Sequence, residues 1–358
     1  MKKCSTEIVV GMDLSDKKSE ICEMRQRDGE ITLRTEVAND VDSLSAFFSN
    51  YSHPETVLIA MEAGTHSPWM SALLADMKFK VVIGNPRKLE FIWKSDNKSD
   101  RRDAEMLARV ARFDLKLFHP ISHRNRESQA DLAVIKARDA LVKTRTALVN
   151  TVRGMLKSMG YKVDPCSTPA FADKLINEMP EEYCFALKDT LEIIRQITGS
   201  IKSYDAKLKK LSREKYPEAE LLQQVNGVGP ITALAFVLTI EDPGRFRKSR
   251  YVGCYLGLVP KRDQSGKVDK ELGITKAGNA YMRSLLVQCA QYILGPFGKD
   301  CELRRFGEKI AGRGGKAAKK KAVIAVARKL SILLHRLWAD NAAYEPFYSK
   351  KSKLRKSA

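Results

Sequence analysis

Five short apolar runs, rich in β-branched residues, lie within the first 86 residues and restrict the fold more than any other feature of the chain. Two segments with helical spacing, VDSLSAFFSNY and SPWMSALLADM, separate the later runs. Asp28-Gly29 joins the second run to the third, as in a tight turn between antiparallel strands. The runs are TEIVVGM, the two halves of KSEICEMRQRDGEITLRTEV, TVLIAME and FKVVIGNP. This order predicts a mixed sheet with helices, that is, an α/β domain over residues 1–125.

Four acidic residues of this region are predicted to lie close together. Asp13 follows the first run and Glu62 ends TVLIAME, and a mixed sheet places the ends of adjacent central strands side by side. Asp100 and Asp103 are three positions apart, which puts both side chains on one helix face. Adjacent carboxylates repel unless a cation neutralises them, and Mg²⁺ prefers oxygen ligands. We therefore predict a catalytic metal site at these four residues, with two Mg²⁺ ions that Mn²⁺ can replace.

Asp100 and Asp103 taken alone have a simpler interpretation. In NKSDRRDAEML they stand among basic residues, with which they could pair on a solvated helix. Asp13 and Glu62 weaken this alternative, because an unpartnered carboxylate at the end of an apolar strand costs several kcal/mol if it is buried.

The charge balance indicates a polyanionic partner. Lys and Arg number 63 against 43 Asp and Glu, which gives a formal net charge of +20 and a pI near 9.6. Such an excess attracts nucleic acid over long range. Ribosomal, membrane-surface and merely soluble proteins can also be basic, so the charge alone leaves those classes open.

The cysteines and the amino terminus indicate a reduced, soluble protein. Seven cysteines form no Cys-x-x-Cys pair, which indicates neither a zinc site nor a disulfide framework. MKKCSTEIVVG lacks the long apolar core of a signal peptide, and no apolar run approaches the roughly 18 residues of a membrane span. We expect a bacterial or archaeal cytosolic protein associated with the nucleoid, without a membrane partner.

A helical arm is predicted over residues 126–216, with a break near GYKVDPCSTPAF. Arg138, Arg145 and Arg153 fall on one side of its first helix. They could bind phosphates of a nucleic acid, or they could form a solvated face.

The segment LLQQVNGVGPITALAFVLTI resembles a helix-hairpin-helix turn. Gly227 and Gly229 precede an apolar helix, whose first N–H groups can hold a phosphate without reading bases. A plain loop before a core helix explains the same residues.

Ser265 stands in a polar stretch between an apolar segment and a helix. A serine can attack a phosphodiester if a base or metal takes its proton and cations bind the phosphate. Four cations are near in sequence: Lys261, Arg262, Lys276 and Arg283. Most Ser-Gly pairs are simply turns.

An ordered set of motifs resembles the insertion-sequence transposases of the one-ten family, including its eleven-eleven subgroup. The motifs run from about residue 8 to residue 295: GMDLS, AMEAG, KSDRRDAEMLA, RTALVNTVRGMLKSMG, VNGVGPITA, YLGLVPKRDQSG and GITKAGNAYMRSLL. The resemblance implies a RuvC-like (ribonuclease H-like) domain whose DEDD acids are Asp13, Glu62, Asp100 and Asp103. It also implies a helical arm, a C-terminal transposase domain with Ser265 as nucleophile, and guidance by a structured non-coding RNA that pairs with donor and target DNA.

The sequence therefore predicts a DNA transposase or recombinase whose acids and Ser265 form a composite site across subunits of a dimer or tetramer. Its partners are double-stranded DNA and the guide RNA. One alternative is a RuvC-like structure-selective nuclease that uses water and leaves Ser265 as a turn residue, and another is a basic RNA or DNA scaffold without activity. The expected domains are residues 1–125, 126–216 and 217–300, followed by a basic helix and tail, 301–358.

Overall fold

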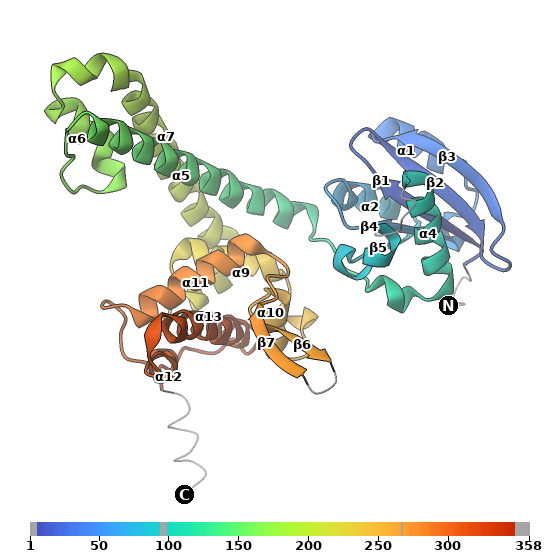
Figure 1. Ribbon diagram of the computed structural model, residues 1–358. Coiled ribbons are helices and arrows are strands. Elements are labelled where there is room, and N and C mark those ends of the chain that lie inside the picture. Colours follow the sequence, from blue (N-terminus) through green and yellow to red (C-terminus); the bar gives the residue numbers. More distant parts are fainter. Residues whose placement is uncertain (1–5, 94–98, 266–267, 348–358) are drawn as a thin grey trace, which may run out of the picture. The chain divides into compact units, whose positions relative to one another are not determined.

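The computed structural model describes residues 6–93, 99–265 and 268–347 of the 358-residue chain (Figure 1). The chain divides into two compact units, Met1–Arg124 and Asn125–Ala358. The first unit is built on a sheet, and the second is mainly helical (Figure 1). Lys98 and the expected basic tail at residues 349–358 lie outside the described residues.

The sheet of the first unit has five strands in the order β3-β2-β1-β4-β5. β1 pairs antiparallel with β2 and parallel with β4, while β2–β3 is antiparallel and β4–β5 is parallel. This confirms the predicted mixed sheet. The strands are β1 Ile8–Leu14, β2 Lys18–Arg25, β3 Ile31–Ala38, β4 Val57–Glu62 and β5 Lys80–Gly84.

Helices cover both faces of this sheet because the central strands are apolar on both sides. α1 (Val41–Phe48) and α2 (Ser67–Asp76) pack on one face, against Val10, Met12 and Ile59. α4 (Asp100–Phe113) packs on the other face, against residues that alternate with these along β1 and β4. The residues facing α4 include Val9, Leu58 and Ala60, and the short helix α3 (Glu90–Trp93) adds Ile92 to the same cluster.

Gly11 allows α4 to lie directly on β1. A Cβ atom at residue 11 would stand 2.0 Å from the backbone oxygen of Ala104 and 2.6 Å from the backbone nitrogen of Ala108. No side chain fits into that space, so the helix backbone contacts the strand backbone. This contact sets the position of the first turn of α4 relative to the carboxyl end of β1.

The second unit begins with a helical arm, as predicted. Its long helices are α5 (Arg126–Ser158) and α7 (Glu181–Lys215), and the short α6 (Phe171–Glu178) packs against both near their far end (Figure 1). Val152, Phe171 and Leu191 are among the buried residues of this end.

The rest of the second unit is a helical body around one large core. Phe236, Leu286 and Leu330 belong to this core, as do Ile135 of α5 and Leu208 of α7. The residues beyond 300 therefore pack on the same core as residues 217–300, and the predicted three-way division beyond residue 125 stays a prediction. The helices are α8 Glu218–Leu222, α9 Pro230–Ile240, α10 Arg250–Tyr255, α11 Ala280–Leu294, α12 Glu302–Ala311 and α13 Gly315–Ala339.

The serine segment forms an antiparallel hairpin, β6 (Pro260–Ser265) and β7 (Val268–Ile274), where the sequence predicted only a polar stretch. All six residues of β6 are exposed, so the strand has no alternating apolar pattern from which it could be predicted. Backbone pairing and a cross-strand ion pair between Arg262 and Asp269 hold it instead.

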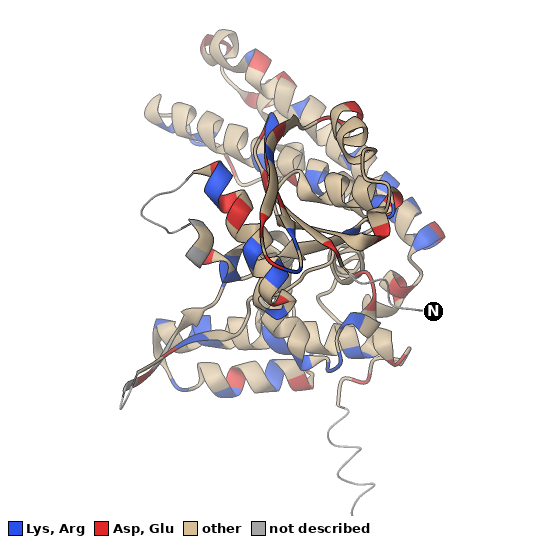
Figure 2. Cartoon of the chain, turned by 90° about the vertical axis from the view of Figure 1, so that its right-hand side faces the viewer, with Lys and Arg blue, Asp and Glu red and all other residues tan. Residues whose placement is uncertain are grey.

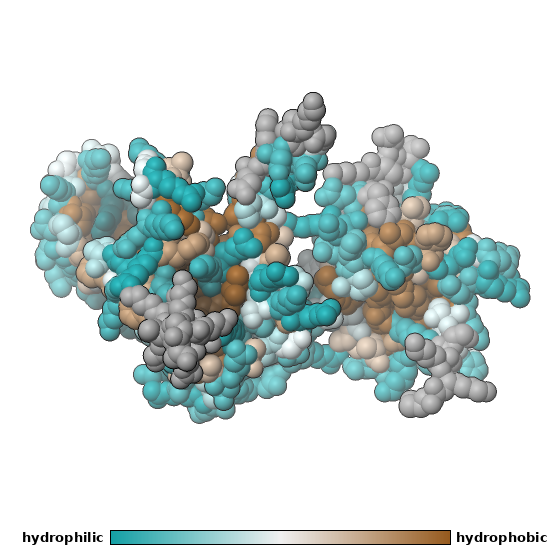
Figure 3. Space-filling view, turned by 90° about the horizontal axis from the view of Figure 1, so that it is seen from below, coloured by the Kyte–Doolittle hydropathy of each residue, from teal (hydrophilic) through white to brown (hydrophobic). Residues whose placement is uncertain are grey.

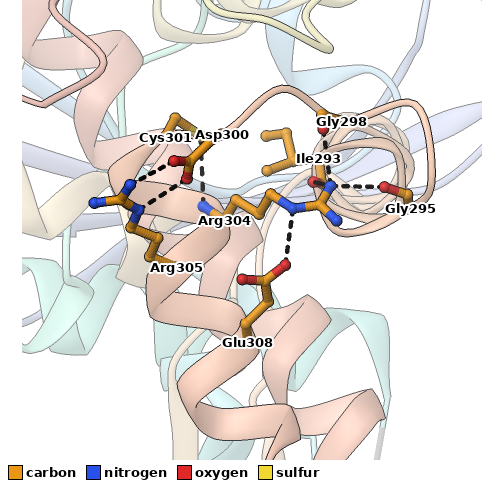
Figure 4. A network of polar contacts seen from close by, with 8 residues as sticks. All are labelled: Ile293, Gly295, Gly298, Asp300, Cys301, Arg304, Arg305 and Glu308. Atoms are coloured by element: carbon orange, nitrogen blue, oxygen red, sulfur yellow. Dashed lines mark hydrogen bonds and ion pairs between the residues drawn. The ribbon is translucent and has the colours of Figure 1, made fainter.

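Arg304 closes the loop between α11 and α12 (Figure 4). Its Nη1 donates to the carbonyl oxygens of Ile293, Gly295 and Gly298 at 2.7–3.0 Å, and its Nε donates to Glu308. One guanidinium thus satisfies carbonyls at the end of α11 and in the loop that follows it.

Charged residues of both signs are distributed along most helices (Figure 2). On the face shown in Figure 3 the exterior is largely hydrophilic, with hydrophobic residues visible between the polar ones. Within the described residues, no helix combines the length and the apolar character that crossing a bilayer requires.

Candidate active site

Asp13 and Glu62 lie on neighbouring parallel strands at the same edge of the sheet. Met12 is opposite Met61 in the β1–β4 register, so Asp13 and Glu62 are the next positions along the two strands. Both side chains are half-buried. Both belong to the face that α4 covers, because Gly11 contacts α4 and Ala60 lies in the α4 core.

The first turn of α4 brings the other two predicted acids to this edge. Ser99 caps the helix by accepting a hydrogen bond from the Arg102 backbone nitrogen at 3.3 Å. Asp103 is buried, with 5% of its surface exposed, next to the Ala104 carbonyl that lies against Gly11. Asp100 is exposed and acts electrostatically on Glu20 of β2. Asp103 is therefore shielded from water, whereas Asp100 is in contact with it.

Glu20 is a further acid at this edge that the sequence analysis missed. It is directly opposite Asp13 in the β1–β2 register, and Glu36 of β3 is directly opposite Glu20. Burial raises the pKa of Glu20, and a hydrogen bond to Glu36 adds to this effect. Counting residues across the short turn 15–17, which joins β1 to β2 and sets their register, is the signal that could have found it.

A row of carboxylates thus crosses four adjacent strands: Glu36, Glu20, Asp13 and Glu62. Lys18 forms an ion pair with Glu36 at the outer end of the row.

These acids fit the implied metal by the chemistry of their donors. All offer carboxylate oxygens, the ligands that Mg²⁺ and Mn²⁺ prefer. Asp103 is buried in the first turn of α4, and buried carboxylates are seldom found unless they are paired. Across the described ranges, no three His, Cys, Asp or Glu side chains are already arranged as a set of metal ligands.

The loop after Glu62 is held by a buried serine. Ser67 Oγ accepts a hydrogen bond from the Gly64 backbone nitrogen at 2.9 Å and lies 2.8 Å from His123 Nε2. Burial lowers the pKa of His123, and the nearby charge of Arg124 lowers it further. The neutral imidazole therefore holds the segment that follows Glu62, and His66 is tied to Trp69 in the same segment.

Ser265 is the last residue of β6, opposite Val268, at the tip end of the hairpin. Its side chain is exposed. An exposed hydroxyl at the end of a protruding hairpin is accessible to a large substrate. Ser265 and the acids belong to different units.

The four predicted cations near Ser265 have different roles in the structure. Arg262 makes a two-pronged contact with Asp269, and Lys261 is exposed. Arg283 Nη1 donates to the carbonyl oxygens of Leu256 and Ala277, at 2.9 and 2.7 Å, and so fixes the segment after β7. Lys276, in that segment, is exposed and has a positive φ of 52°.

Two of the three arm arginines face the neighbouring helix. Arg145 is 9% exposed between α5 and α7, donates to Thr198 at 3.4 Å, and has a pKa lowered by burial. Arg138 pairs with Asp205 of α7. Arg153 is exposed and lies over the Phe171 ring at 5.1 Å. The predicted stripe is thus mainly part of the helix–helix contact.

Gly227 and Gly229 precede α9 as predicted. Gly227 has a φ of +91°, and a Cβ there would lie 2.9 Å from the Tyr292 ring of α11, so the turn needs glycine. Gly229 is the N-cap residue of α9, with Pro230 as the first helical residue.

Comparison with known protein families finds two matches. Residues 219–299 match the family described as "Transposase IS116/IS110/IS902 family". Residues 10–160 match a family described as "Transposase", DEDD_Tnp_IS110. The first match covers the serine hairpin, and the second covers the acids.

Two relatives are similar over most of their length, and a third over less than half of it. The "Transposase for insertion sequence element IS1111A" of Coxiella burnetii is 26% identical over 80% of this chain and 78% of its own. The "Probable family 20 transposase" of Pseudomonas aeruginosa is 26% identical over 81% of this chain and 86% of its own. A "Pilin gene-inverting protein" of Moraxella bovis is 27% identical over 42% of this chain and 47% of its own.

Proposed function

The chain belongs to the IS116/IS110/IS902 family of transposases, which are DNA recombination enzymes, and from this premise we propose that it moves its insertion sequence by joining Ser265 covalently to DNA. The observation that carries the phosphodiester chemistry is the register that sets Asp13 beside Glu62, on the face of the sheet that α4 covers. The exposed position of Ser265 supports the covalent route.

Asp13, Glu62, Asp100 and Asp103 would hold the divalent cations, Mg²⁺ with Mn²⁺ as a substitute. When bound, these ions supply positive charge that stabilises an in-line displacement at phosphorus. Asp103, being buried, is held in place for this task by the packing of α4 on Gly11.

Ser265 Oγ attacks the scissile phosphorus, its O–H proton is lost, and the bond from phosphorus to a deoxyribose oxygen breaks. That oxygen leaves and takes up a proton. The serine ester conserves the energy of the broken bond, so the reverse attack by a deoxyribose hydroxyl of a new partner can rejoin the DNA without another energy source. Lys261 is exposed on strand β6 of the hairpin and is available to the phosphate, while Arg283 keeps the adjoining segment in place.

The protein acts with a structured non-coding RNA of its own element, as a dimer or tetramer. The net charge of +20 supports a nucleic-acid complex of this kind. Guidance by base pairing would require no base-reading side chains in the protein.

A metal-dependent nuclease is the second candidate, because the same acids could serve attack by water. Ser265 would then have no chemical role. The two candidates differ in whether a protein–DNA bond forms.

The test uses the full chain with its associated RNA and a DNA duplex of the element end, nicked near the crossover so that the released fragment cannot be rejoined. Wild type should accumulate an adduct whose peptide map places the DNA on residue 265. Ser265→Ala should bind the DNA as wild type does but form no adduct and no recombinant. Ser284→Ala, an exposed serine on α11 of the same unit, should behave as wild type. An adduct on another hydroxyl, or recombination by Ser265→Ala, would favour the nuclease or a different nucleophile.

A further inference from the structure

A groove lies between the base of the serine hairpin and α13, with a volume of about 750 Å³. The hairpin contributes Pro260, Leu272 and Ile274, α12 contributes Phe306, and α13 contributes a stripe at helical spacing. Figure 1 shows the hairpin beside α10 and α13. This volume is within the usual range for small-ligand sites and is far too small to enclose a duplex.

The floor of the groove is apolar. It consists of Leu258, Leu272, Ile274, Phe306, Ile324 and Ile332. Leu272 is 46% exposed, which is a large fraction for a leucine in a strand. An apolar, partly aromatic floor suits the flat faces of nucleobases.

The rim is basic. Lys320, Lys321, Arg328 and Lys329 line the α13 side, and no acidic residue is among the described residues that line the groove. Lys329 Nζ lies 3.9 Å from the centre of the Phe306 ring, so the ammonium group of Lys329 lies over the aromatic part of the floor.

A second groove of the same unit lacks this charge pattern. That groove, of about 490 Å³, lies between α12, α13 and residues 342–346, and Glu302, Asp340 and Glu345 line it together with basic residues. Its mixed charge does not favour a polyanion. Charge complementarity therefore favours the groove at the hairpin over this second groove.

We propose that the groove between the hairpin and α13 binds the DNA strand next to the phosphate that Ser265 attacks, with unpaired bases on the floor and their phosphates on the basic rim. This inference rests on the proposed function. Pro260 is five residues from Ser265, a span of about 17 Å along a strand. That span corresponds to about five nucleotides of stacked strand.

The occupant is DNA and not duplex RNA or protein. A strand being exchanged must leave its old partner before it pairs with a new one, so bases near the crossover are unpaired during the reaction. The groove shields those bases from water while the strand changes partner.

The test measures the binding of the full chain, cleared of RNA, to a short DNA duplex with a central unpaired bubble and to the same duplex fully paired. Wild type should prefer the bubble roughly tenfold. Lys320→Ala with Lys321→Ala should lose this preference, and the slope of log K against log salt for the bubble should fall by about 1.4, since each phosphate contact to an unpaired strand contributes about 0.7.

The matched control is Lys316→Ala with Lys319→Ala, which removes the same charge from exposed positions of the same helix that do not line the groove. It should keep the preference for the bubble. Leu272→Gln changes the floor but not the charge, so it should lose the preference and keep the salt slope. All variants are first checked for wild-type thermal unfolding.

Equal weakening of both probes by the two lysine pairs would overturn the inference, as would tighter binding of an RNA bubble than of the DNA bubble. Either result leaves the Ser265 adduct experiment unaffected. Absence of any wild-type adduct would instead contradict the proposed function, whatever the groove binds.

Discussion

At the scale of single residues, the acids of the candidate site differ mainly in their exposure to water. Asp103 is buried, Asp13 and Glu62 are half-buried, and Asp100 is exposed. Replacing an acid that packing holds in place should reduce DNA cleavage more than it reduces nucleic-acid affinity.

Asp103→Asn should abolish DNA cleavage and leave nucleic-acid affinity within a few-fold of wild type, because a metal ligand is lost while the basic surface is not. Asp13→Asn and Glu62→Gln should do the same. Asp42→Asn, an exposed acid at the start of α1, is the control and should retain activity. Cleavage would be measured on labelled DNA with Mg²⁺, with Mn²⁺ and with excess chelator. Full activity in chelator would contradict the metal assignment.

Glu20 should make the stability of the first unit depend on pH. Its pKa is raised, first by burial and then by its contact with Glu36, so the folded unit holds this proton more tightly than the unfolded chain does. That stabilisation is complete below the ordinary carboxyl pKa of 4.5 and is lost as pH rises through the raised value.

Glu20→Gln cannot lose the proton, so in metal-free protein it should unfold at a higher temperature than wild type at neutral pH. The difference should vanish in acid. Calorimetry of the full chain would measure it, with the exposed Glu55→Gln as control. A gain that is the same at all pH values would rule out titration of Glu20 as its cause.

At the scale of elements, the contact between β1 and α4 decides whether the acids of the site meet. Gly11→Ala should destabilise the first unit by about 1–3 kcal/mol or more, because its Cβ would meet backbone atoms that have no room to move. Gly64→Ala is the control, since a Cβ there meets nothing within 4 Å. Chemical denaturation would show the difference. If the two variants were equally stable, the close packing of α4 on β1 would be wrong.

At the scale of the whole molecule, the net charge of +20 would attract the proposed guide RNA, which is a polyanion. Affinity for bare duplex should fall steeply with salt, because each neutralised phosphate releases counterions. Recombination by purified protein should cease after complete ribonuclease treatment and return when the RNA of the element is added back. Undiminished recombination without RNA would remove guidance by RNA from the proposal.

The order of strands and helices could be predicted from the sequence because apolar periodicity is a property of short segments, and the proposal of Asp13, Glu62, Asp100 and Asp103 as metal ligands starts from the same local spacing. Glu20 could not be found in this way, since it becomes part of the site through the register of β2 against β1. The same is true of the hairpin that carries Ser265: its exposed residues have no apolar pattern, and backbone pairing between segments decides it. Arg145 could have been a surface cation, but it is buried against α7. Which face of a helix is buried depends on the neighbouring helix that packs against it. Local segments thus determined which elements form, and only long-range packing decided which side chains those elements bring together.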